Sequence, residues 1–137
     1  MKKDILQYKV EQMIVAIVPR DGEISDPKAD FWDVWLVNLR ADAITNVLVV
    51  GKGYGKLERE ATKTSTLRHF FEKIDGETAV KIEPIQARLF ELTNEYWISF
   101  THNGYMYDKK YVFVKGSIAE EHLTRIPVLE REGVMIR

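Results

Sequence analysis

The dipeptide Asn103-Gly104 constrains the fold of this chain more than any other feature of its sequence. It lies between two runs of aromatic and β-branched residues, 95–102 and 105–115. A two-residue type I′ turn needs a positive φ at both central positions, which Asn and Gly tolerate, and its twist matches that of antiparallel strands. The sequence therefore predicts a hairpin with a ladder of cross-strand pairs. These pairs are Thr101 with Met106, Phe100 with Tyr107 and Tyr96 with Tyr111.

The composition is that of one globular domain, and we expect residues 1–137 to form it, because 45% of the 137 residues are hydrophobic. Twenty basic and 21 acidic side chains give a net charge of -1, without the strongly basic character of a general nucleic-acid binder. Cysteine is absent, which excludes disulfides and thiolate chemistry. The apolar run at residues 13–18 is too short for a secretory signal, and no run approaches the roughly 20 residues that span a bilayer. We expect a cytoplasmic protein without a membrane segment.

Several further runs have the pattern of strands bounded by turn residues. The runs 31–39 and 44–51 are apolar on both faces, so we expect them to pair as a central hairpin in which Leu36 faces Val47. Pro84 lacks an amide donor, which places the run 78–85 at a strand end or sheet edge. Residues 57–64 form either an edge strand or a loop, and residues 22–30 form an exposed loop. The other expected strands cover residues 10–18, 88–92, 126–129 and 134–136.

One segment has the periodicity of a helix. Leu67, Phe70, Phe71 and Ile74 occur at i, i+3, i+4 and i+7, on one face of a helix over residues 65–74. Asp75-Gly76 would supply the glycine that follows many helix ends. We therefore predict a mainly β protein, an antiparallel β-sandwich or open barrel with one short packed helix, about residues 65–74. An α+β sheet covered by that helix is the alternative.

A weak basic patch is a candidate site for nucleic acid or another anion. Cations there would follow a phosphate backbone while a tyrosine stacks on a base. The alternative is a solvated edge whose lysines discourage aggregation. The glycines within residues 51–56 match neither a P-loop nor a dinucleotide fingerprint, and they indicate a bulge or a crowded strand. The candidate residues are Lys52, Tyr54, Lys56, Arg59, Lys63 and Arg68.

The tryptophans are candidates for a groove or an interface. Strand alternation puts Trp32 and Trp35 on opposite faces of one strand, and Trp97 on the face opposite Tyr96 and Phe100. Our leading hypothesis is a non-enzymatic binding or scaffolding domain that acts through protein–protein contact, as a homodimer or with another protein. Nucleic-acid binding, with RNA or tRNA as the ligand, is the second hypothesis.

Catalytic and metal-binding motifs do not occur in the sequence. Its three histidines lack metal-ligand spacing and no serine lies in a nucleophile motif, so we predict no metal, no cofactor and no catalytic residue. A small-molecule pocket or enzyme is the third hypothesis, in which His69 or His102 would act with a nearby carboxylate.

Six phrases of the sequence carry a resemblance, namely Gly53-Tyr-Gly55 and residues 63–71, 80–84, 94–97, 107–111 and 133–136. They resemble a family of short uncharacterised bacterial proteins. The similarity covers most of the chain, and some members of that family carry the label phenylalanyl-tRNA synthetase subunit. A class II synthetase core needs a far larger antiparallel sheet than this length can hold. The resemblance therefore implies one compact domain and no catalytic residues.

Overall fold

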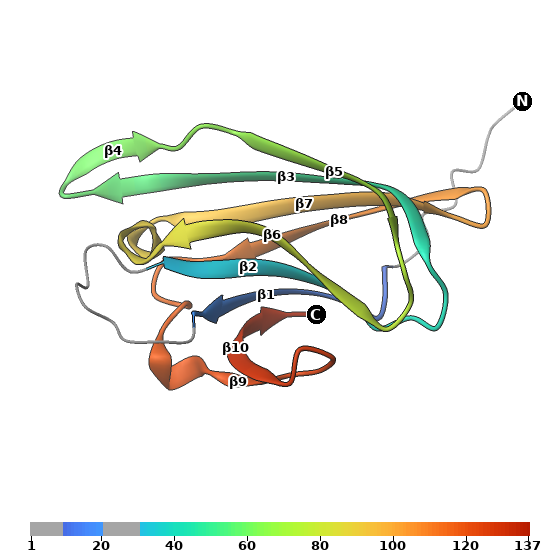
Figure 1. Cartoon of the computed structure of the whole chain (residues 1–137). Coiled ribbons are helices and arrows are strands. Elements are labelled where there is room, and N and C mark those ends of the chain that lie inside the picture. The colour runs from blue at the N-terminus through green and yellow to red at the C-terminus, as the bar shows by residue number, and fades with distance from the viewer. Residues whose placement is uncertain (1–9, 21–30) are drawn as a thin grey trace, which may run out of the picture.

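The computed structural model describes residues 10–20 and 31–137, which form two antiparallel sheets stacked as layers (Figure 1). The first sheet has the strand order β6-β2-β1-β10-β9, and the second has β4-β3-β7-β8, with β5 also paired to β3. This arrangement confirms the predicted mainly β fold, a sandwich that does not close into a barrel. The strands are β1 (Met13–Pro19), β2 (Phe31–Asn38), β3 (Ile44–Leu57), β4 (Glu60–Lys63), β5 (Leu67–Ile74), β6 (Thr78–Gln86), β7 (Thr93–His102), β8 (Tyr105–Phe113), β9 (Thr124–Ile126) and β10 (Arg131–Ile136).

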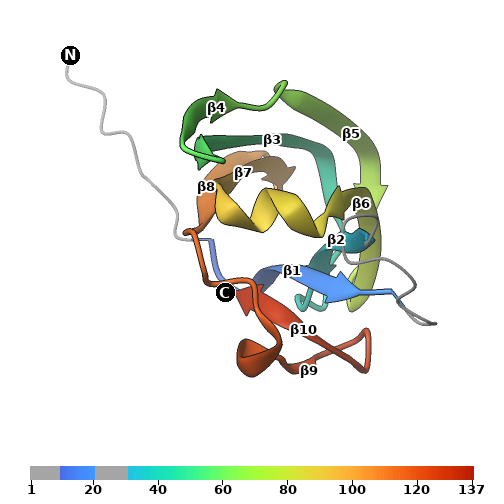
Figure 2. The same cartoon turned by 90° about the vertical axis from the view of Figure 1, so that its left-hand side faces the viewer.

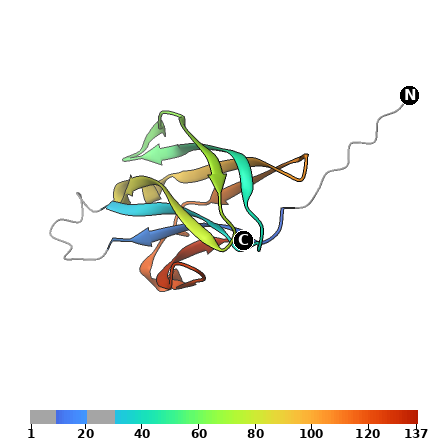
Figure 3. The ribbon, with the colours of Figure 1, turned by 45° about the vertical axis from the view of Figure 1, so that its right-hand side comes forward.

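The predicted hairpin is present as β7 and β8, and its tip projects beyond the strands of the first sheet (Figure 3). Asn103 and Gly104 have φ values of 51° and 79°. A type I′ turn requires a positive φ at both of its central positions. All three predicted pairs occur in the register. Phe100 and Tyr107 stack with their ring centroids 5.1 Å apart.

The predicted helix at 65–74 is wrong, because this segment is strand β5, paired antiparallel to the edge of β3. The alternation of a strand separates the two phenylalanines: Phe71 packs against the core, whereas Phe70 is 62% exposed. Pairing with β3 supplies cross-strand backbone hydrogen bonds along β5, which outweighs a local periodicity of about two turns. Within the described residues the only helices are the short 3₁₀ segments η1 (Ala87–Glu91) and η2 (Glu120–His122). The strand predicted at 88–92 is therefore also wrong.

The second predicted hairpin is wrong as well. Strand β2 pairs with β1 and β6, and Leu36 faces Val15 and Val80 instead of Val47. The link between β2 and β3 carries the chain from one sheet to the other. Asn38 holds this crossing, because its side-chain amide donates to the carbonyls of Asp42 and Asp75 at 3.0 and 3.1 Å.

The remaining strand predictions are close to the structure. Pro84 lies in β6 at the edge of the first sheet, as predicted. Residues 57–64 complete an edge hairpin of β3 and β4 around a turn at Glu58 and Arg59. Of the two C-terminal runs, 134–136 lies within β10, whereas 126–129 overlaps β9 only at Ile126 and continues into the turn before β10. The loop predicted at residues 22–30 lies outside the described residues.

The main core fills the space between the sheets. It includes Leu36 and Val15 from the first sheet and Tyr96, Phe100 and Tyr111 from the second. Helix η1, yellow in Figure 2, crosses one end of the sandwich between the two layers. A smaller cluster covers the other face of the first sheet, with Ile14, Ala16, Val18, Val37 and Ile126 at its centre.

Candidate functional site: the outer face of the second sheet

The second sheet presents to solvent a face on which aromatic and basic side chains alternate across the strands. Because Tyr96, Ile98 and Phe100 of β7 point into the core, Trp97 and Ser99 point outward. The register extends this outward row over four strands, from Arg68 in β5 through Val50 and Trp97 to Lys110 in β8. We call the outward side of β3, β5, β7 and β8 the outer face.

A groove of about 510 Å³ runs over the outer face. Its floor is apolar and its sides carry the cationic groups, so it offers both a stacking surface and charge. The groove is lined by Leu48, Val50, Lys52, Thr66, Arg68, Glu95, Trp97, Ser99 and Lys110.

Trp97 is the central side chain of this groove and is 43% exposed. The Lys110 ammonium lies 5.5 Å from the centroid of its ring, within the range of a cation–π contact. Arg68 and Lys110 form no ion pair with a described residue. Two cations on opposite sides of an exposed indole are therefore available to an anionic partner.

Glu95, the one acid among the described residues that line the groove, is already engaged. It is buried, it accepts a hydrogen bond of 3.0 Å from the Tyr54 hydroxyl, and Lys52 Nζ lies 3.8 Å from its other oxygen. The hydrogen bond to Glu95 is the main reason why the pKa of Tyr54 is raised above its ordinary value. The Lys52 ammonium and the Tyr54 hydroxyl therefore largely compensate the negative charge of Glu95 on the outer face.

The structure brings part of the predicted basic set onto this face. Lys52, Tyr54 and Arg68 lie on it, and Lys63 is the cross-strand neighbour of Tyr54. Lys56 faces Ala61 further along the same hairpin, and Arg59 occupies its turn with a φ of 72°. The set therefore follows β3, β4 and β5 rather than a helix surface.

Sequence reasoning missed Lys110. The signal was present, because the Asn103-Gly104 turn fixes the register of β7 and β8 and so places Lys110 opposite Trp97. Leu48 and Val50, which form the groove floor, were predicted only as strand residues.

Of the three candidate tryptophans, Trp97 is the one that lines this groove. Trp32 is 9% exposed and packs edge to face on Phe90, with the ring centroids 5.1 Å apart. Trp35 lies on the other side of the first sheet, against the smaller cluster, with Lys81 Nζ 5.6 Å from the centroid of its ring.

The histidines take separate positions. His69 Nε2 lies 2.7 Å from Glu83 Oε1, while His102 lies between Arg40 and Asp42, at 3.2 and 3.3 Å. Among the residues that the structure describes, no three His, Asp or Glu side chains are grouped so that they could hold a metal ion. That part of the chain also contains no helix with the length and hydropathy needed to cross a bilayer.

In comparisons with known proteins, the chain matches no family model, no curated protein and no solved structure. The resemblance to the short bacterial family therefore stays a prediction.

Proposed function

We propose that this protein is a non-enzymatic binding domain whose outer face binds single-stranded nucleic acid, RNA being the natural candidate. The observation that carries this proposal is the exposed Trp97 with Lys110 and Arg68 on either side of it in one cross-strand row. Proteins that bind single strands combine aromatic platforms for the bases with cations that follow the backbone.

The proposed contacts follow from the chemistry of each group. A base stacks on the indole of Trp97, and the flanking phosphates pair with Arg68, Lys110 and Lys52. Phe70, which is 62% exposed, and Tyr54 offer further stacking surfaces on the same side of the sheet. The cations are local, which is compatible with a net charge of -1 for the whole chain.

The protein-contact hypothesis rests on the same exposed aromatic side chains. In a twofold dimer through the outer face, each copy would present the same patch to the other. The cationic side chains of one copy would then face the cationic patch of the other, which is unfavourable. The charge of the outer face thus favours an anionic partner over a second copy, and a nucleic-acid ligand agrees with the predicted cytoplasmic location.

Fluorescence anisotropy of 5′-labelled oligouridine and oligothymidine tests the proposal. With three phosphate contacts, we expect the logarithm of the association constant to fall with the logarithm of salt concentration with a slope of about -2. Trp97→Ala should weaken binding by about 1–3 kcal/mol, because one stacking surface is lost.

A matched pair of triple variants separates the outer face from general charge. Lys52→Gln, Arg68→Gln and Lys110→Gln together should abolish most of the salt dependence. The control, Arg88→Gln, Lys115→Gln and Arg125→Gln, removes the same charge from exposed positions outside the outer face and should bind like the wild type. Equal binding by the two triple variants would refute the proposal. If sedimentation velocity instead found a dimer that Trp97→Ala dissociates, and oligonucleotides did not bind, the protein-contact hypothesis would replace it.

A further inference from the structure

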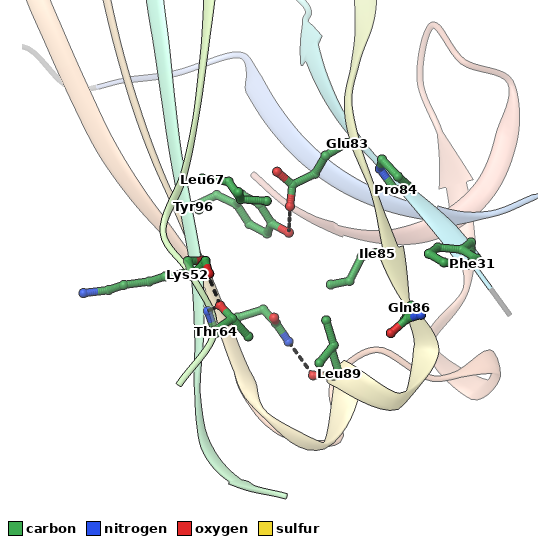
Figure 4. A pocket seen from close by; sticks show the side chains of 14 residues that line it. Phe31, Lys52, Thr64, Leu67, Glu83, Pro84, Ile85, Gln86, Leu89 and Tyr96 are labelled. Carbon is green, nitrogen blue, oxygen red and sulfur yellow. Dashed lines mark hydrogen bonds between the residues drawn. The ribbon is translucent and has the colours of Figure 1, made fainter. Parts of the chain in front are cut away.

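A second concavity opens at the end of the sandwich, between the two sheets and beside η1 (Figure 4). Its volume is about 300 Å³, at the lower end of the range of small-molecule sites. It lies on the inner side of the second sheet, away from the outer face, so it is independent of the proposed function.

Two glycines of β3 allow the side chains of β7 that form one wall of this pocket to pack closely against β3. A Cβ atom on Gly51 would lie 2.8 Å from the ring carbon Cε1 of Tyr96, and one on Gly53 would lie 2.8 Å from Oδ1 of Asn94. Without these Cβ atoms, Tyr96 and Asn94 pack directly against β3. The Asn94 amide then donates to the carbonyl of Leu89 at 2.9 Å, which fixes η1 beside the pocket.

Glu83 is the charged group inside the pocket. Its side chain is 12% exposed, its Oε1 lies 2.7 Å from His69 Nε2, and its Oε2 accepts from the Tyr96 hydroxyl at 3.5 Å. Lys52 also borders the pocket, but its ammonium group points away from it (Figure 4). Among the residues that the structure describes, His69 is therefore the only basic partner of this carboxylate.

The walls around Glu83 are largely apolar. They are formed by side chains from the start of β2, from β5, from β6 and from η1. A carboxylate between apolar walls attracts a cation more strongly than one in water, because the local dielectric constant is lower. The wall residues are Phe31, Leu67, Ile85 and Leu89.

We infer that this pocket binds a small organic amine, with the ammonium group on Glu83 and an apolar or aromatic group against the walls. An anionic ligand would meet the Glu83 carboxylate, and no lining residue in the described part of the chain directs a cation into the pocket to offset the repulsion. A neutral ligand of the same shape would contact the walls but bring no positive charge to Glu83. The cationic group is thus the feature that the site selects.

Isothermal titration calorimetry with three probes of one shape tests this inference. The probes are phenethylamine, 2-phenylethanol and phenylacetate. We expect phenethylamine to bind, 2-phenylethanol to bind at least about tenfold more weakly, since a charged hydrogen bond is lost, and phenylacetate not to bind. Equal binding of the amine and the alcohol would contradict the inference, as would no binding of phenethylamine or hexylamine at about 10 mM, near the weak limit for ligands of this size.

Variants assign the binding to Glu83. Glu83→Gln should lower the affinity for phenethylamine at least about tenfold. Glu91→Gln, on an exposed side chain paired with Lys115 outside the pocket, should leave it unchanged. If Glu83→Gln does not fold, Leu89→Trp tests the same site, because it fills the pocket from η1 and should abolish binding. Wild-type affinity in a folded Glu83→Gln or Leu89→Trp variant would overturn the assignment, whatever oligonucleotide binding shows at the outer face.

Discussion

The hydroxyl of Tyr111 in β8 donates a hydrogen bond of 3.1 Å to the backbone carbonyl of Met13 in β1, and so connects the second sheet to the first. The Tyr111 side chain is fully buried. Tyr111 is also the cross-strand neighbour of Tyr96 in the aromatic ladder that begins at the Asn103-Gly104 turn. One hairpin thus contributes both a local ladder and a direct polar contact across the core.

Removing only this hydroxyl measures that contact. We expect Tyr111→Phe to lower the free energy of unfolding by about 1–2 kcal/mol, because a buried carbonyl loses a donor. Tyr111→Ala, which also leaves a cavity, should cost about 3–5 kcal/mol. Urea denaturation followed by circular dichroism gives both values. Met106→Ala, at a side chain that is 76% exposed in the same strand, should change stability by less than about 0.5 kcal/mol. A Tyr111→Phe variant as stable as the wild type would show that the hydroxyl contributes nothing.

The buried tyrosines predict a loss of stability at alkaline pH. Burial raises the pKa of both Tyr96 and Tyr111 above the ordinary value of 10.0, and the charge of Glu83 adds to the effect on Tyr96. Above that pH the unfolded chain releases these two protons while the folded chain keeps them. The unfolded state then binds fewer protons, so the free energy of unfolding falls as pH rises, and below pH 10.0 these groups cause no such loss. Urea midpoints from about pH 9 to 12 should fall less steeply for the double variant Tyr96→Phe, Tyr111→Phe. Identical slopes for variant and wild type would disprove this linkage.

The features predicted correctly from the sequence are those with local causes. The type I′ turn depends on Asn103 and Gly104 themselves, and the register of β7 and β8 follows from it without further information. The edge position of β6 follows in the same way from the missing amide of Pro84. The turn between β3 and β4 was not predicted, because Glu58 and Arg59 have φ values of 53° and 72° although neither residue type favours a positive φ.

Strand β5 could not be predicted from its own residues. Its apolar positions fit a helix period, and its pairing depends on β3, a partner that local periodicity does not reveal. The outer face depends on the same pairing. Arg68 and Trp97 belonged to separate predicted sets, and it is β3, lying between β5 and β7, that brings them into one row. Only the position of Lys110 followed from local turn geometry.

Phe70 and Phe71 distinguish the strand from the helix in solution. On the predicted helix both rings would lie on the buried face. In β5 only Phe71 packs against the core, so we expect Phe71→Ala to lower the free energy of unfolding by about 2–4 kcal/mol and Phe70→Ala by less than about 1 kcal/mol. Urea denaturation of the two variants makes the comparison. Similar large losses for both would favour a helix.

Gly76 has a different role in the structure from the one that the sequence predicted, and this difference can be tested. It was expected to follow the end of a helix, but it lies in the turn between β5 and β6, where a Cβ atom would overlap the backbone carbonyl of Ala41. That turn is held against the β2–β3 link by a hydrogen bond of 3.0 Å from the Glu77 amide to the Arg40 carbonyl. Backbone atoms cannot move aside as a flexible side chain can, so we expect Gly76→Ala to cost about 3 kcal/mol. Gly104→Ala has open space around it and only a left-handed φ of 79° to satisfy, so it should cost about 1 kcal/mol. Thermal and urea unfolding of the two variants would rank them, and a Gly76→Ala variant no less stable than Gly104→Ala would mean that the two links do not approach as closely as described.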